Sequence, residues 1–379
     1  MSRSVDPGHL QSAAALDNTI SSPIILPSKL LAVVADDSDY HLKPAVFVAE
    51  AAGAVKRVEL ESGQVTRTFR PDTSTPVPLN CLALGQVIAM SQGGQTLART
   101  LYAGSSDKCI YSWNLLLDCE GRICYFDKGT TFIGHTDFVQ TVLCVRLGTQ
   151  QILMSASADA TIIIWNASTG EKLHLLKSRS GGVQALAIDL LFATPSGVTL
   201  FSGDSNGEIR GWNISSTWAQ EISTDAETQP SPEGRVTPLI AHETSICALK
   251  FEKDQDSEFD LWTASADKMV KRFSRLNNWT TNTVLQHEDF IRDIVLDEQG
   301  GKVITACCDG KVRVWDKVSG SLVHTFVGHD EEVTGLAMVQ ANGWRGVVSV
   351  SIDGTIRRWS LGQEDLKKAI DGAAKPVHM

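Results

Sequence analysis

The stretch SIDGTIRRWS, residues 351–360, places an aspartate six residues before a tryptophan, with a turn-forming Asp-Gly pair and a β-rich run between them. The same interval recurs along the chain, and its second position falls seven times at spacings of 42 to 61 residues. A fixed period of this length predicts seven structural units of one kind. Four copies are complete and three are degenerate: Asp107 with Trp113, Asp159 with Trp165, Asp309 with Trp315, Asp353 with Trp359, then Asp267 with Phe273, Asn206 with Trp212, and Gly53 with Glu59.

A histidine marks the start of four of these units, 28 to 31 residues before the aromatic position: His135, His242, His287 and His329. Because the histidine and the aromatic residue recur at a nearly constant distance, they mark one repeated unit. Within a unit, short runs rich in Val, Ile, Thr and Leu alternate with turn residues, which is typical of strands rather than helices. The run at 162–164 is apolar on both faces, so we expect each sheet to be packed between two neighbours.

The Gly-His start, the Trp near the end and the period resemble the WD40 repeat family over roughly residues 29–361. The resemblance implies an all-β fold, a seven-bladed WD40 β-propeller of four-stranded antiparallel blades. It also implies that an N-terminal segment completes the last blade, and TISSPIILP at 19–27 is the segment we expect to do so. The predicted organisation is a flexible tail at 1–18, a propeller at 19–361, and a C-terminal tail with a short helix at 362–379.

In this family the best-formed blades contain a buried hydrogen-bonded chain of His, Ser or Thr, Asp and Trp. A buried indole N–H needs an acceptor, an imidazole can donate and accept, and a carboxylate accepts, so the four groups leave few polar atoms unpaired. By position, the resemblance implies three such structural tetrads: His135, Ser155, Asp159 and Trp165; His287, Thr305, Asp309 and Trp315; His329, Ser349, Asp353 and Trp359.

Metal and cofactor sites are not expected. The four marker histidines fall one per unit around a ring, so they cannot meet on a single ion. The 8 cysteines include no CxxC pair, which favours free thiols in a reducing compartment over disulfides or zinc. The acidic run at 254–260 resembles a calcium loop, but Phe259 stands where the sharp turn needs glycine, so we expect a solvated loop.

Composition narrows the partners. A net charge of −10 disfavours direct nucleic-acid binding, and no signal peptide or membrane-length apolar run is present. We expect a monomeric propeller in the cytoplasm or nucleus.

One catalytic pattern occurs. Gly203-Asp-Ser205-Asn-Gly207 fits the G-x-S-x-G string that exposes a nucleophilic serine in hydrolases. The residues that follow are strand-like, whereas the hydrolase turn is followed by a helix. We therefore expect no enzyme, with a Ser205 hydrolase as the alternative class.

The resemblance implies that partners bind the narrower face of the ring, at residues just after each His loop. We predict a protein-interaction scaffold or adaptor in a multiprotein complex; the alternative partner class is ubiquitin or a degradation substrate. Phe138 and Phe290 either form interface hot spots or tuck under their blades. The segment at 213–241 is either a docking insert or surface decoration. The predicted contact residues are Phe138, Gln140, Gln184, Cys247, Phe290, Arg292, Glu332 and Thr334.

Overall fold

A computed structural model describes most of the chain: residues 22–37, 44–89, 97–118, 122–194, 196–215, 217, 219–222, 239–252, 260–341 and 344–361. Both expected tails, including the C-terminal helix, lie outside these ranges, as does most of the acidic run at 254–260. The described residues form strands and turns and no helix. This part of the chain accordingly holds no helix able to cross a membrane.

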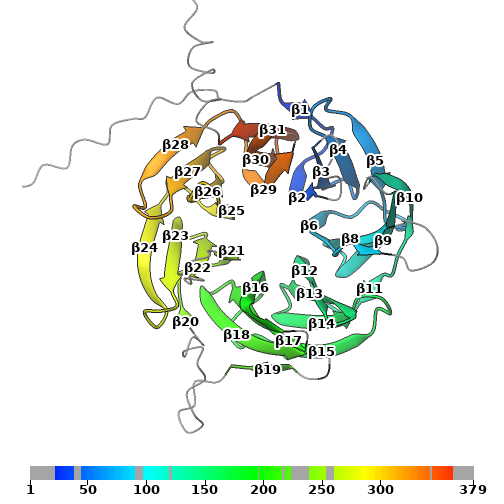
Figure 1. The fold of residues 1–379 in the computed structure, drawn as a ribbon, viewed down its shortest axis with the longest axis horizontal. Helices are drawn as coiled ribbons and strands as arrows, with labels where there is room; N and C mark the ends of the chain where they lie inside the picture. Colours follow the sequence, from blue (N-terminus) through cyan, green and yellow to red (C-terminus); the bar gives the residue numbers. More distant parts are fainter. Residues whose placement is uncertain are drawn as a thin grey trace, which may run out of the picture.

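Seven antiparallel sheets stand around a central axis, and the first strand of each sheet lines the centre of the ring (Figure 1). The predicted all-β, seven-bladed fold is confirmed in the described residues. Blades are numbered here in chain order. Blade 1 consists of β2 (Leu30–Asp36), β3 (Ala45–Glu50), β4 (Val55–Glu59) and β5 (Val65–Phe69).

Blade 2 is the largest sheet, because two short strands extend its four main ones. Its strands are β6 (Leu79–Leu84), β7 (Ile88–Ala89), β8 (Leu97–Ser105), β9 (Cys109–Leu117), β10 (Ile123–Lys128) and β11 (Phe132–Ile133). Blade 3 is regular and consists of β12 (Val139–Leu147), β13 (Gln150–Ser157), β14 (Thr161–Asn166) and β15 (Lys172–Lys177).

Blade 4 uses part of the 213–241 segment as structure. Its inner strands are β16 (Val183–Thr194), β17 (Gly197–Asp204) and β18 (Glu208–Ser215). Two short strands from the segment, β19 (Ala219–Glu221) and β20 (Leu239–Ile240), both pair with β18. Blade 5 consists of β21 (Ile246–Phe251), β22 (Leu261–Ser265), β23 (Met269–Ser274) and β24 (Thr280–Gln286).

The ring closes in blade 7, where the two ends of the described chain share one sheet. The outermost strand is β1 (Ile24–Ile25), which pairs antiparallel with β31 (Thr355–Ser360). β1 lies inside the expected closing segment 19–27. The other strands of blade 7 are β29 (Val333–Ala341) and β30 (Trp344–Ser351), and blade 6 consists of β25 (Ile291–Asp297), β26 (Lys302–Cys307), β27 (Val312–Asp316) and β28 (Leu322–Phe326).

Apolar burial explains why the units form a ring. The described core divides into seven clusters, and each cluster draws its side chains from two neighbouring blades. The cluster between blades 7 and 1, for example, joins Val348 and Ile356 to Leu30 and Val46. Since no blade has a core of its own, each depends on both neighbours for burial of its two faces. Closure therefore holds the whole domain together.

Candidate interaction surface

One face of the ring is assembled by the same backbone hydrogen bond in every blade. The first N–H after the second strand donates to the carbonyl that precedes the first strand, as from Ala158 to Phe138 (3.0 Å) and from Cys308 to Phe290 (2.8 Å). This bond fastens each loop before an innermost strand to the turn between the second and third strands. We call the surface made by these loops and turns the turn face; its seven turns are residues 51–54, 106–108, 158–160, 205–207, 266–268, 308–311 and 352–354.

Every innermost strand carries a β-bulge at its second residue, directly below the turn face. In blade 3, Val139 pairs with Ser157 and Thr141 pairs with Ala156, which leaves Gln140 as the extra residue. A bulge turns its side chain away from the regular alternation of the strand. The register shifts identify seven bulged residues: Leu31, Asn80, Gln140, Gln184, Cys247, Arg292 and Thr334.

Five of these seven residues are among the predicted contacts, and sequence reasoning missed Leu31 and Asn80. Their signal was available, because each follows an apolar residue, Leu30 or Leu79, that begins an innermost strand. Blades 1 and 2 lack the histidine marker, as does blade 4, whose bulged residue Gln184 was nevertheless predicted.

Three bulged side chains tie neighbouring blades together. Asn80 Nδ2 donates to the Val139 carbonyl (3.2 Å), and Thr334 Oγ1 donates to the Leu30 carbonyl (2.9 Å). Arg292 forms an ion pair with Glu332 at 2.9 Å. These contacts join neighbouring innermost strands at three places: between blades 2 and 3, between blades 7 and 1, and between blades 6 and 7.

Two aromatic rings project from the turn face. Phe138 is 48% exposed and Phe290 is 46% exposed, so neither ring is enclosed beneath its blade. Each phenylalanine has its own N–H capped by the preceding aspartate, at 2.8 Å in blade 3 and 2.9 Å in blade 6. Half-exposed aromatic side chains on a fixed backbone are the kind of group that forms interface hot spots.

In blade 3 the four predicted tetrad residues lie in one hydrogen-bonded chain. Ser155 Oγ accepts from Trp165 Nε1 (2.8 Å) and lies 2.8 Å from His135 Nε2, while His135 Nδ1 lies 3.1 Å from Asp159. Asp159 also accepts from the backbone N–H of Thr136 at 2.7 Å, so the chain fixes the loop before β12. Blade 7 repeats the arrangement with His329, Ser349, Asp353 and Trp359.

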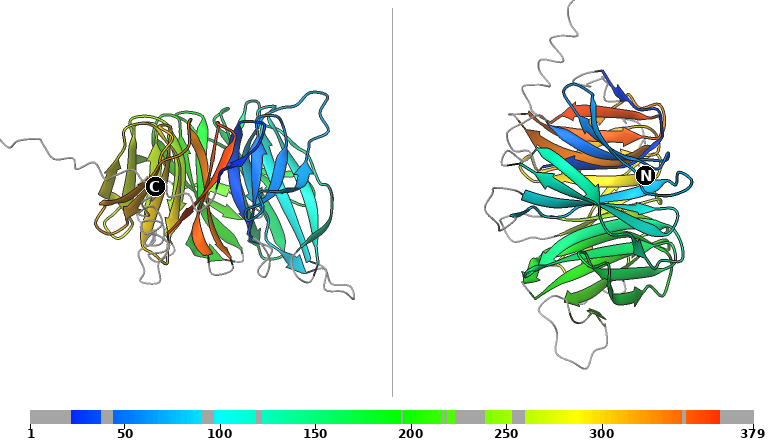
Figure 2. Two further views of the ribbon diagram at one scale, coloured as in Figure 1. Left: turned by 90° about the horizontal axis from the view of Figure 1, so that it is seen from above. Right: turned by 90° about the vertical axis from the view of Figure 1, so that its right-hand side faces the viewer.

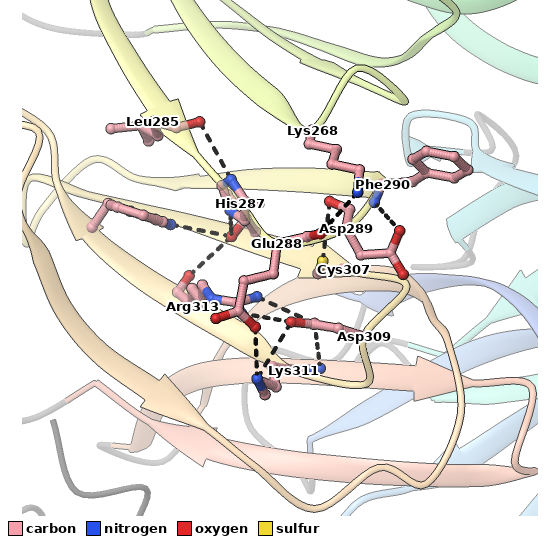
Figure 3. A network of polar contacts seen from close by, with 12 residues as sticks. Lys268, Leu285, His287, Glu288, Asp289, Phe290, Cys307, Asp309, Lys311 and Arg313 are labelled. Carbon is pink, nitrogen blue, oxygen red and sulfur yellow. Dashed lines mark hydrogen bonds and ion pairs between the residues drawn. The ribbon is translucent and has the colours of Figure 1, made fainter. Parts of the chain in front are cut away.

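Blade 6 departs from this arrangement, as Figure 3 shows. Thr305 joins His287 (2.8 Å) and Trp315 (3.2 Å), but His287 Nδ1 faces the Leu285 carbonyl at 3.3 Å. Asp309 instead pairs with Arg313 at 2.5 Å. The prediction that Asp309 completes this tetrad is therefore wrong.

The reason for the departure lies in β27 and the turn before it. In blade 3 the hydroxyl of Thr161 bridges Asp159 (2.6 Å) and His135 (3.1 Å). Blade 6 combines two differences: Lys311 at the equivalent position offers no hydroxyl, and the charged Arg313 pairs with the carboxylate.

Either difference alone is compatible with a contact between histidine and aspartate. Blade 5 has Met269 in place of the hydroxyl and blade 7 has Arg357 in place of Arg313, and both blades keep this contact.

Blades 4 and 5 contain partial versions of the chain. In blade 5, His242 contacts Thr263 (2.7 Å) and Asp267 (2.8 Å), and Phe273 takes the tryptophan position. In blade 4, Trp212 donates to Ser202 at 2.9 Å without a histidine. The tetrad is thus complete in blades 3 and 7 and partial in blades 4, 5 and 6.

Burial and hydrogen bonds set the charge states of the tetrad histidines and aspartates. Burial lowers the pKa of His135, His242 and His329, which leaves their rings neutral. Burial and the adjacent Arg313 lower the pKa of His287 to about 4. Burial opposes ionisation of Asp159, but hydrogen bonds from Thr161 and from the Thr136 N–H hold its pKa below the usual value. Neutral imidazoles beside ionised carboxylates form clamps that depend on pH.

The turn face shows no catalytic constellation in its described part. Ser205 lies in the turn between β17 and β18, so it joins two strands. The side chain of His242, in the loop beside that turn, contacts Thr263 and Asp267. Among the described residues there is no group of three or more metal-ligating side chains. The seven described cysteines are free, and burial raises the pKa of Cys247 and raises that of Cys308 to about 11, so neither is a ready nucleophile.

The closed ring of seven four-stranded antiparallel blades defines the class of this protein as a seven-bladed β-propeller. Three segments match the family model described as WD domain, G-beta repeat: residues 126–166, 279–316 and 320–360. They contain the tryptophans of blades 3, 6 and 7. The chain thus carries WD40 repeats at these three positions of the propeller.

Relatives resemble this chain in sequence along much of its length. An uncharacterized WD repeat-containing protein of Schizosaccharomyces pombe is 29% identical over 91% of this chain and 83% of its own length. The nuclear distribution protein nudF of Aspergillus niger is 26% identical over 84% of this chain. A p21-activated protein kinase-interacting protein 1-like of Xenopus laevis is 24% identical over 60% of it. The chain spans 58% and 55% of these last two proteins.

Proposed function

We propose that this protein is a non-enzymatic interaction scaffold that binds a peptide or protein partner on the turn face, as an adaptor in a multiprotein complex of the cytoplasm or nucleus. One observation carries the proposal: all seven innermost strands bulge at the same residue below that face, beside two half-exposed phenylalanines. Bulges that re-aim side chains, next to exposed aromatic rings on a rigid frame, suit recognition.

The relatives support the same role. One of them is named for its interaction with a p21-activated protein kinase, and WD40 propellers are generally non-enzymatic. The free thiols fit a reducing compartment. A rigid ring with loops on one face is a scaffold on which binding residues can vary without loss of the fold.

Affinity capture followed by mass spectrometry tests the proposal. The tagged protein is compared with a Phe138→Ala, Phe290→Ala double variant and with a matched control, Leu175→Ala with Val284→Ala. The control residues are 55% and 51% exposed and lie on the outer strands β15 and β24, away from the turn face. We expect the face variant to lose partners that the control keeps. Ubiquitin or ubiquitin-ligase subunits among those partners would identify the degradation class.

Two results would contradict the proposal. One is an unchanged partner list for the face variant. The other is turnover of a generic ester panel that Ser205→Ala abolishes, which would establish the hydrolase alternative.

A further inference from the structure

Blades 3 and 4 present their bulged residues side by side. β12 and β16 are neighbouring innermost strands, as Figure 1 shows. The loop before β16 lies against the turn of blade 3, since the Ser178 N–H donates to the Ala160 carbonyl at 2.8 Å. A Cβ added at Gly182 would lie 2.8 Å from the Ala158 carbonyl oxygen, so only glycine permits this approach. We call Phe138, Gln140, Gln184 and the loop at 178–182 the amide sector.

The two glutamines of the amide sector have unused hydrogen-bonding groups. Both side chains are partly exposed, and within the described residues neither makes a hydrogen bond. By contrast, the side chains of Asn80, Arg292 and Thr334 form hydrogen bonds with neighbouring blades. Each free carboxamide can donate two hydrogen bonds and accept two.

The polar groups around the glutamines are mostly uncharged or already engaged. The carboxylate of Asp137 accepts from the Phe138 N–H. Asn206 Nδ2 donates to the Ser180 carbonyl at 2.7 Å, between the turn and the loop of blade 4. Arg179 is 78% exposed in its side chain and lies 3.8 Å from Glu221, on the outer strand β19. Apart from the Asp137 carboxylate and Arg179, which lies toward Glu221 on the outer strand, the polar groups described here are amides and hydroxyls. The sector therefore favours a ligand held through neutral hydrogen bonds, whereas blades 6 and 7 present Arg292 and Glu332 at the same level.

Phe138 is held firmly beside these amides. The Phe138 carbonyl accepts from Ala158 at 3.0 Å, and Ser157 Oγ donates to the Asp137 carbonyl at 3.0 Å. The bond from the Thr136 N–H to Asp159 anchors the other end of the loop. A loop whose backbone is fixed before binding loses little conformational entropy when a ligand arrives.

We propose that the amide sector binds an extended, uncharged peptide segment, with Gln140 and Gln184 hydrogen-bonded to its main chain and an apolar side chain packed on Phe138. An extended main chain presents a donor and an acceptor at each residue, which is the pattern that a carboxamide complements. The inference rests on the proposed function, because it assigns a ligand class to part of the turn face.

The test begins with a random linear peptide library displayed on phage and selected on the wild-type protein. Fluorescence anisotropy then measures an enriched peptide against wild type and three variants. Gln140→Leu with Gln184→Leu removes the polar groups at similar size, and Gln140→Glu with Gln184→Glu keeps acceptors and removes donors. Gln64→Leu with Gln220→Leu is the matched control, because both glutamines are exposed and lie outside the loops and turns of the turn face.

We expect the Leu variant to weaken binding by about tenfold or more, as loss of two hydrogen bonds implies. The Glu variant should fall between it and wild type, and the control should stay within about twofold. N-methylation of single peptide amides should cause a similar loss at one or two positions, which a contact through side chains alone would not produce.

Three results overturn the inference: no enriched peptide, enriched peptides that require a charged residue, or binding that is kept in the Leu variant. The last result leaves the proposed function intact and moves the site. Failure of the proposed function appears separately, as an unchanged partner list after Phe138→Ala with Phe290→Ala.

Discussion

Two loops of the turn face have nearly the same sequence and different restraints. Residues 135–140 read HTDFVQ and residues 287–292 read HEDFIR. Each precedes an innermost strand, carries a half-exposed phenylalanine and ends at a bulge. In blade 3, Asp159 bonds both the histidine and the loop backbone, whereas in blade 6 Asp309 bonds Arg313. The restraint on a loop is thus decided by the strand that faces it.

The surroundings of the two rings differ accordingly. Lys268 of blade 5 lies 6.0 Å from the Phe290 ring and donates to the Glu288 carbonyl at 3.0 Å. Phe138 has no such cation beside it among the described residues. The same loop motif therefore places Phe290 beside a lysine on blade 6 but gives Phe138 no described cation on blade 3.

The largest expected effect is on the blade 3 clamp. Asp159→Ala should lower the free energy of unfolding by about 3 kcal/mol, since the Thr136 N–H loses its acceptor and the buried His135 Nδ1 keeps only the Thr161 hydroxyl. Chemical denaturation measures the loss, and amide exchange at 136–138 should accelerate. In Asp309→Ala, exchange at 288–290 should keep its wild-type rate, because Asp309 does not hold that loop. Equal acceleration in the two variants would remove the distinction between the loops.

The second effect concerns pH. The pKa of His287 in the folded state, about 4, lies below the value of about 6.5 in an unfolded chain, so the folded protein binds fewer protons. Its contribution to stability is complete above about pH 6.5 and is lost as the pH falls toward 4. His287→Gln should reduce the slope of unfolding free energy against pH by up to about 1.4 kcal/mol per pH unit in that window.

His135→Gln is the matched comparison for this titration. Burial lowers the pKa of His135, but Asp159 opposes this effect. His135→Gln should therefore change the slope of unfolding free energy against pH less than His287→Gln does. Chemical denaturation at several pH values between 7 and 4.5 measures both slopes. A larger change for His135→Gln would mean that His135, rather than His287, has the more strongly lowered pKa.

A smaller effect should follow from giving blade 6 the residues of blade 3. Lys311→Thr with Arg313→Ile supplies the bridging hydroxyl and removes the competing guanidinium, so Asp309 should turn to His287. We expect a gain of about 1 kcal/mol and slower amide exchange at 288–290. A crystal structure of the variant with Asp309 still more than 4 Å from the imidazole would show that another feature sets the blade 6 geometry.

The smallest expected effect is on stability at the two rings. Phe138→Ala and Phe290→Ala each remove a half-exposed side chain, so each should change the free energy of unfolding by about 0.5 kcal/mol or less. Thermal denaturation checks this. A loss of 2 kcal/mol or more in one of them would mean that its ring serves the fold rather than the surface.

Much of this arrangement could be predicted from the sequence, because it is local and repeated. The interval from Asp159 to Trp165 fixes a turn and a strand, and its recurrence predicts the number of blades. Other features depend on residues that meet only in space. The bond from Asn80 to the Val139 carbonyl and that from Thr334 to the Leu30 carbonyl join neighbouring blades and follow no repeat signal. Leu31 and Asn80 were missed although each follows an apolar residue, as the correctly predicted Gln184 does.

The sequence by itself predicted the fold of this protein, since repeated strands that are apolar on two faces need a neighbouring sheet on each side, and the resemblance to WD40 repeats implies a closed ring that supplies one. Only the tertiary structure decided which carboxylate each histidine meets, which bulged side chains remain free, and how firmly each phenylalanine is held. The physical reason is competition: a carboxylate such as Asp309 bonds the strongest donor within reach, and reach is set by the packed strands rather than by spacing along the chain.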